Sequence, residues 1–174
     1  WKMLSTGYNY SGPAAIRYPR GEGPGTEILK NFDLLEIGKA RVINEVLSDL
    51  VIFSFGNMLN VSMEISDEIG CSLVDMRFIK PLDEELIEKY AKTHKYIITI
   101  EENVISGGAG SAVNEYLTKI GYSDKLKIFG VPDDFPIVGS QEDQREAAGL
   151  SKNKILEKLS LELDLKDLKK KVSA

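Results

Sequence analysis

The fold class is most clearly indicated by one stretch of the sequence, Tyr96-Ile97-Ile98-Thr99-Ile100-Glu101-Glu102-Asn103-Val104-Ile105-Ser106-Gly107-Gly108-Ala109-Gly110-Ser111. Its first five residues form an apolar run of the kind found in strands that are buried in parallel sheets. Two carboxylates and a glycine-rich turn follow, and a predicted helix then runs to Gly121 with apolar residues along one side. The stretch therefore predicts a strand, a loop and a helix, which is the repeating unit of a parallel α/β sheet.

The same alternation extends in both directions from this stretch. We expect strands at 40–43, 50–55, 72–78 and 126–131, and helices at 58–69, 81–92, 140–149 and from 151 to about 163. The segment before Leu50 is too short for a helical crossover, so the first strand is expected to be antiparallel. The predicted fold is a three-layer α/β/α domain with a mostly parallel sheet and one antiparallel edge strand.

Composition excludes several classes of function. The 174 residues carry 22 basic and 27 acidic side chains, for a formal net charge of −5, which argues against a nucleic-acid surface. No apolar run approaches the roughly 20 residues of a membrane-spanning helix. Cys71 is the single cysteine, so neither a disulfide framework nor a thiolate metal site is expected. These features predict a protein of a reducing compartment, the cytoplasm.

Two arginines near the start are candidates for binding an anion. The run Gly12-Pro13-Ala14-Ala15-Ile16-Arg17-Tyr18-Pro19-Arg20-Gly21 places them three residues apart, with a proline that ends any strand through Ile16 to Tyr18. Arg20 would then project from the carboxyl end of that strand, where open α/β sheets place their ligands. The alternative is that Arg17 and Arg20 form surface or interface ion pairs.

A second candidate site follows the strand at 96–100. Glu101 and Glu102 would point to opposite sides of the strand, and we favour the reading in which one of them caps the next helix or bridges to another subunit. The free amides after the glycines could instead bind an anion. Arg77, at the end of an earlier strand, is expected to meet Glu101 or Glu102 in a structural ion pair.

The remaining reactive side chains point to no catalytic site. His94, the one histidine, follows a helix and is expected at its solvent-exposed C-terminus. Cys71 is expected to be a buried small apolar residue, and Asp133 and Asp134 solvated loop acids. With no nucleophile–histidine pair and no metal-ligand spacing in the sequence, we predict neither catalytic residues nor a metal site in this chain.

Several of these segments together resemble the 1-deoxy-D-xylulose 5-phosphate synthases, which are transketolase-like thiamine diphosphate enzymes. The resemblance runs from about Met3 to Leu159 and is carried by the strings at 12–21, 73–83, 99–103, 107–111 and 130–133. The Glu-Glu and glycine-rich part is shared more loosely with transketolases and with β subunits of 2-oxo acid dehydrogenases. The loop at 133–139 departs from the family pattern, which often has His or Gln before the glycine.

The resemblance implies a homodimeric enzyme that condenses pyruvate with D-glyceraldehyde 3-phosphate and releases CO2, using thiamine diphosphate and Mg2+. It also implies that Arg20 grips the phosphate of the acceptor. Arg17 is a candidate substrate-binding residue from the residue pattern alone. The cofactor-binding and catalytic residues of the family lie upstream of the matched region. This chain is therefore expected to be an inactive C-terminal fragment that binds no cofactor and has the remainder of the same enzyme as its partner.

The resemblance divides the chain into three parts. Residues 1–25 are predicted to be a remnant of the pyrimidine-binding domain with a linker, 26–160 a transketolase-type C-terminal domain, and 161–174 a tail. Two other interpretations stay open. The chain could be a piece of another thiamine diphosphate enzyme, a transketolase or a 2-oxo acid dehydrogenase, or it could be a non-enzymatic module for dimerisation or anion binding.

Overall fold

The computed structural model describes residues 1–19, 25 and 33–163. The described elements, in chain order, are α1 (Lys2–Asn9), β1 (Arg41–Asn44), β2 (Leu50–Ser54), η1 (Gly56–Met58), α2 (Leu59–Ile69), β3 (Ser72–Asp75), α3 (Glu84–Thr93), β4 (Tyr96–Val104), α4 (Ala109–Ile120), η2 (Ser123–Lys125), β5 (Leu126–Val131), α5 (Gln141–Ala147) and α6 (Lys152–Glu162). Arg20, most of the linker and the tail beyond Leu163 lie outside the described residues.

The five strands form one sheet in the order β1-β3-β2-β4-β5. β3, β2, β4 and β5 are parallel to one another, and β1 is antiparallel to β3 at the edge. The chain moves from β2 outward to β3, then crosses over β2 to β4 and continues to β5. The strand order therefore reverses between β2 and β4, the position at which open α/β sheets bind ligands.

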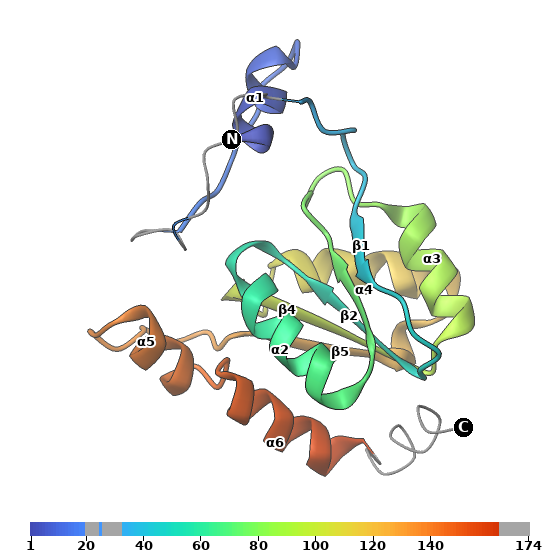
Figure 1. The fold of residues 1–174 in the computed structure, drawn as a ribbon, viewed down its shortest axis with the longest axis vertical. Coiled ribbons are helices and arrows are strands. Elements are labelled where there is room, and N and C mark those ends of the chain that lie inside the picture. The colour runs from blue at the N-terminus through green and yellow to red at the C-terminus, as the bar shows by residue number, and fades with distance from the viewer. Residues whose placement is uncertain (20–24, 26–32, 164–174) are drawn as a thin grey trace.

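Helices cover both faces of the sheet, and each face has its own apolar core (Figure 1). On one face, Ile65 of α2 and Ile155 and Leu159 of α6 pack with strand residues such as Ile52 and Ile98. On the other, Ile87 of α3 and Val113 of α4 pack with residues such as Val51, Phe53 and Ile97. β2 is buried along its whole length because both of its faces are covered. The predicted three-layer fold is confirmed.

Local signals place most helix ends where the sequence predicts them. Gly70 and Gly121 end α2 and α4 in the left-handed conformation, which glycine adopts without strain. The Asp83 side chain accepts the amide of Leu86 at the start of α3. Ser140 and Asp143 form a capping box that begins α5.

Three segments differ from the sequence expectation. β3 ends at Asp75 instead of Phe78, because Arg77 takes a positive φ of 57° that interrupts the extended backbone. β4 continues past Ile100 to Val104. Residues 16–18 form no strand and have irregular backbone, while α1, which was not predicted, precedes them and lies apart from the sheet in Figure 1.

Within the described part of the chain, every helix is too short or too polar to cross a lipid bilayer.

Candidate functional site

A hollow of about 470 Å³ lies where the strand order reverses. Its walls come from residues 55–57, which follow β2, from residues 101–103 near the end of β4, and from Ile79 after β3. The irregular segment 17–19 forms the remaining wall. Three of the sequence candidates, Arg17, Glu101 and Glu102, therefore line the same hollow.

The first of these glutamates is fully engaged by helix α4. Glu101 is 3% exposed, and its carboxylate accepts the amide of Ala109 at 2.8 Å through Oε2 and that of Gly110 at 2.6 Å through Oε1. A carboxylate is favourable there because the first amides of a helix are unpaired and the helix dipole is positive at that end. These amides are therefore not available to an external anion.

Glycine is required beside this carboxylate because there is no space for a side chain. A Cβ on Gly108 would meet the carbonyl oxygen of Val104 and would lie 2.7 Å and 2.8 Å from the two carboxylate oxygens of Glu101. A Cβ on Gly110 would lie 2.7 Å from both Ile128 Cγ2 and Thr99 Oγ1. The glycine-rich turn thus allows α4 to pack closely against β4 and β5.

The second glutamate points to the other side of the strand and binds a different helix. Glu102 Oε1 lies 2.6 Å from Nε of Arg145 in α5, and the two side chains are 31% and 19% exposed. The expected ion pair of Arg77 with Glu101 or Glu102 is not formed, because both carboxylates have other partners. Arg145 was missed by sequence analysis, since nothing in the local pattern of residues 141–147 shows which strand end they approach.

A second hollow, of about 400 Å³, adjoins the first. Pro19, Glu102 and Asn103 line both, and Arg145, Asp134 and Pro136 line the second alone. The loop at 133–139 therefore has a defined position beside the end of β4. The amide of Gln144 donates to the carbonyl of Ile137 at 3.1 Å and so ties this loop to α5.

Of the two arginines in the first motif, the described residues include only Arg17. Arg17 is exposed at the wall of the larger hollow and has no ion-pair partner among residues 1–19, 25 and 33–163. Arg20 falls outside the described residues. Across the described ranges, no group of three or more His, Cys, Asp or Glu side chains is arranged to hold a metal ion.

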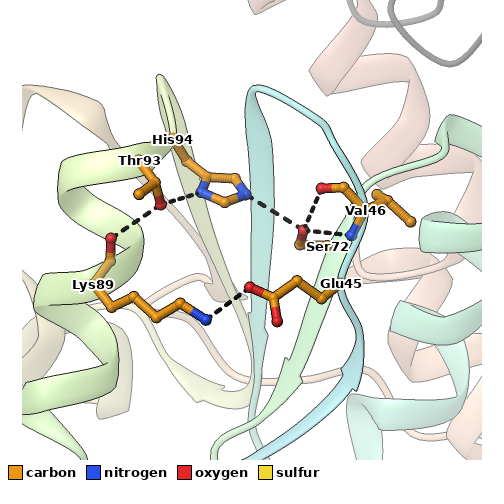
Figure 2. Close-up of polar contacts among 6 residues, drawn as sticks. All are labelled: Glu45, Val46, Ser72, Lys89, Thr93 and His94. Carbon is orange, nitrogen blue, oxygen red and sulfur yellow. Dashed lines mark hydrogen bonds and ion pairs between the residues drawn. The ribbon is translucent and has the colours of Figure 1, made fainter.

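His94 is buried, which corrects the expectation that it lies in solvent at the end of a helix. It is 8% exposed, and its ring stacks edge-on against Tyr90 with ring centroids 4.9 Å apart. Nδ1 lies 2.9 Å from the hydroxyl of Thr93, and Nε2 lies 3.3 Å from that of Ser72 (Figure 2). Tyr90 lies one helical turn before His94, but Ser72 reaches the ring only when β3 and α3 pack together, and the order of the residues does not show that contact.

The hydroxyl of Ser72 extends this network to the segment after β1. It contacts both the amide and the carbonyl of Val46 at 3.2 Å, while the neighbouring Glu45 pairs with Lys89 of α3 at 2.7 Å (Figure 2). Burial lowers the pKa of His94, and the carboxylates of Glu45 and Asp49 oppose that shift only in part. Cys71, immediately before β3, is fully buried, and burial raises the pKa of its thiol to about 12.

We expect the stability of the chain to fall on mild acidification through His94. Its folded pKa lies below the unfolded value of about 6.5, so the unfolded chain takes up the proton first. The stabilisation is complete above pH 6.5 and is lost as the pH falls toward the folded pKa. Urea unfolding at pH 7.5 and pH 5.5 measures the free energy of unfolding of the wild type and of His94→Gln. The wild type's advantage in free energy of unfolding should be smaller at pH 5.5 than at pH 7.5. An equal difference at both values would contradict it.

Comparison with known proteins assigns the fold to a family. Residues 38–155 match the family described as transketolase, C-terminal domain. The chain is 43% identical over 164 residues to the 1-deoxy-D-xylulose-5-phosphate synthase of Vibrio atlanticus (strain LGP32), covering 91% of this chain and 26% of that protein. It is 45% identical over 155 residues to the enzyme of the same name from Psychromonas ingrahamii, covering 86% of this chain and 25% of that protein.

Among solved structures, one described as "Split gene transketolase, inactive beta4 tetramer" is similar to this chain, with a TM-score of 0.69 and 27% identity. The similarity covers 80% of this chain and 47% of the transketolase chain. The chain spans about a quarter of the length of the synthases that it matches. The family match covers all five strands of the sheet and the hollow at β2 and β4, apart from the wall made by residues 17–19. The chain therefore belongs to the transketolase C-terminal domain family.

Proposed function

We propose that the chain is the C-terminal portion of a 1-deoxy-D-xylulose 5-phosphate synthase. The observation that carries this proposal is the identity of 42–45% to synthases of this name, which extends over most of the chain and includes residues before the family domain. The reaction is the condensation of pyruvate with D-glyceraldehyde 3-phosphate, with loss of CO2. Its product supplies precursors for isoprenoids, thiamine and pyridoxal phosphate.

We propose that the chain has the three parts expected from the sequence. Residues 26–160 are the C-terminal domain, and the family match at 38–155 falls inside these limits. Residues 1–25 belong to the preceding pyrimidine-binding domain and its linker, and 161–174 form a tail. The exposed aromatic residues Trp1, Tyr8 and Tyr18 are compatible with an N-terminal part that packs against further protein.

The cofactor site is assigned to the rest of the enzyme. The resemblance to the synthases puts the residues that bind thiamine diphosphate and Mg2+ upstream of the region that this chain matches. When bound, the cofactor supplies the carbanion chemistry of decarboxylation. We propose that this chain holds neither cofactor nor catalytic residue, that the enzyme is a cytoplasmic homodimer, and that the C-terminal domain borders the substrate entrance.

The test uses the intact polypeptide and the isolated chain. The intact protein, supplied with thiamine diphosphate, Mg2+, pyruvate and D-glyceraldehyde 3-phosphate, is expected to release CO2 and form 1-deoxy-D-xylulose 5-phosphate. The isolated chain is expected to show no heat of thiamine diphosphate binding in calorimetry. Formation of a different ketose phosphate, or an acyl group transferred to a carrier, would indicate a transketolase or a 2-oxo acid dehydrogenase instead.

Arg20 is proposed to bind the phosphate of the acceptor in the intact enzyme. Replacement by alanine is expected to raise the KM for D-glyceraldehyde 3-phosphate by at least tenfold, because a charge-assisted hydrogen bond is worth about 1.5–3 kcal/mol. Steady-state kinetics measures the effect, with the KM for pyruvate as the internal control. An unchanged acceptor KM would remove Arg20 from the phosphate site.

A further inference from the structure

Two glutamates near the end of β4 line the same hollow as Arg17. Glu101 is held by the amides of Ala109 and Gly110, and Glu102 by Arg145. Arg17 lines the same hollow as both glutamates, yet it forms no ion pair with any residue that the structure describes. The two carboxylates that line this hollow are therefore bound to other groups.

The two glutamates differ in how easily they could turn toward Arg17. Glu101 is buried and bound through both oxygens, so it cannot move without leaving two amides unpaired. Glu102 is 31% exposed, and the only hydrogen bond or ion pair of its side chain to a described residue is the one to Arg145. Once released from Arg145, this carboxylate would be free to bind a guanidinium in the same hollow.

Arg145 is itself held firmly in position. It belongs to α5, whose first turn is fixed by the capping box of Ser140 and Asp143, and its carbonyl accepts the amide of Leu150 at 2.7 Å. Its side chain is 19% exposed, so solvent screens the pair with Glu102 less than it screens an exposed pair. The Nε–Oε1 distance of 2.6 Å is that of a short charge-assisted hydrogen bond.

We infer that Arg145 is a positioning residue that keeps Glu102 away from Arg17, so that the guanidinium of Arg17 stays free to bind a phosphate group of the substrate. This inference rests on the proposed function, because that phosphate belongs to the acceptor aldehyde. Arg145 does not touch the substrate. It acts by occupying the carboxylate that would otherwise compete with the phosphate for the same cation.

The test is a charge-competition experiment on the intact enzyme with its cofactor. Arg145→Gln is expected to raise the KM for D-glyceraldehyde 3-phosphate about fivefold or more, with little change in kcat or in the KM for pyruvate. The double variant Glu102→Gln/Arg145→Gln lacks the competing charge and is expected to return the acceptor KM to within about twofold of wild type. With unphosphorylated D-glyceraldehyde as acceptor, Arg145→Gln should have no effect on KM.

The outcomes separate this inference from the proposed function. If the wild type makes no 1-deoxy-D-xylulose 5-phosphate, the proposed function fails. If the wild type is active, an unchanged acceptor KM in Arg145→Gln overturns the inference. An acceptor KM that is raised as much in the double variant as in the single variant also overturns it. So does an equal increase in KM for phosphorylated and unphosphorylated D-glyceraldehyde. Arg145→Lys keeps a positive charge opposite Glu102, so its KM for D-glyceraldehyde 3-phosphate should stay closer to wild type than that of Arg145→Gln. Circular dichroism checks that each variant is folded.

Discussion

Replacing Glu101 by alanine is expected to lower the free energy of unfolding of this chain by about 3 kcal/mol. The carboxylate is the acceptor for two buried amides at the start of α4, those of Ala109 and Gly110. Without it, both amides stay buried and unpaired, at a cost of about 1–3 kcal/mol each. Water entering the space left by the side chain would recover part of this cost, so the expected loss lies below the sum.

Urea unfolding followed by circular dichroism measures the change, and a neighbouring residue provides the matched control. Glu102→Ala removes the same kind of side chain, but its ion pair with Arg145 is partly exposed, so a loss of about 1 kcal/mol or less is expected. Glu101→Gln should fall between the two, because its side-chain amide can accept one of the two hydrogen bonds but not both. Equal losses for Glu101→Ala and Glu102→Ala would show that Glu101 does not cap α4.

Replacing Gly108 by alanine is expected to destabilise the chain by about 3 kcal/mol through overpacking alone. The added Cβ would collide with the carbonyl of Val104 and with both carboxylate oxygens of Glu101. Neither neighbour can yield easily, since one is main chain and the other is held by the amides of α4. The backbone of Gly108, at φ −78° and ψ −172°, suits any residue, so conformational strain contributes nothing.

Thermal unfolding would report this loss as a decrease in Tm of about 6–12 °C. Gly12→Ala is the matched control. The three atoms nearest its Cβ would all belong to the ring of Tyr10, whose side chain is half exposed and can turn away. The stability should therefore stay within about 0.5 kcal/mol of wild type. A stable Gly108→Ala variant would mean that α4 can shift away from β4 at little cost.

The elements that were predicted correctly depend on short-range chemistry. Gly70 and Gly121 stop their helices because the left-handed residue after a helix favours glycine wherever the helix packs. The Ser140–Asp143 capping box needs only four consecutive residues. The apolar run at 96–100 is buried in the sheet, as its composition indicates, because no exposed strand would carry it.

Two incorrect expectations, those for His94 and Arg77, concern contacts between residues that are distant in the sequence. His94 is buried by Tyr90 and by Ser72, which lies 22 positions earlier in the chain, so its place next to a helix end was misleading. Arg77 was expected to meet the glutamates because it follows a neighbouring strand. The order of residues does not show that Arg77 has a positive φ, nor that Glu101 binds the amides of α4 and Glu102 binds Arg145.

The α/β class, the antiparallel first strand, the helix ends and the resemblance that led to the family could all be predicted from the amino-acid sequence. These follow from periodicity, from caps and from short strings, all of which act over a few residues. Three features became visible only in the folded chain: β1 pairs with β3, the strand order reverses between β2 and β4, and Arg145 reaches Glu102 from 43 residues away. Such contacts depend on how the layers pack, and the same local pattern is compatible with several packings.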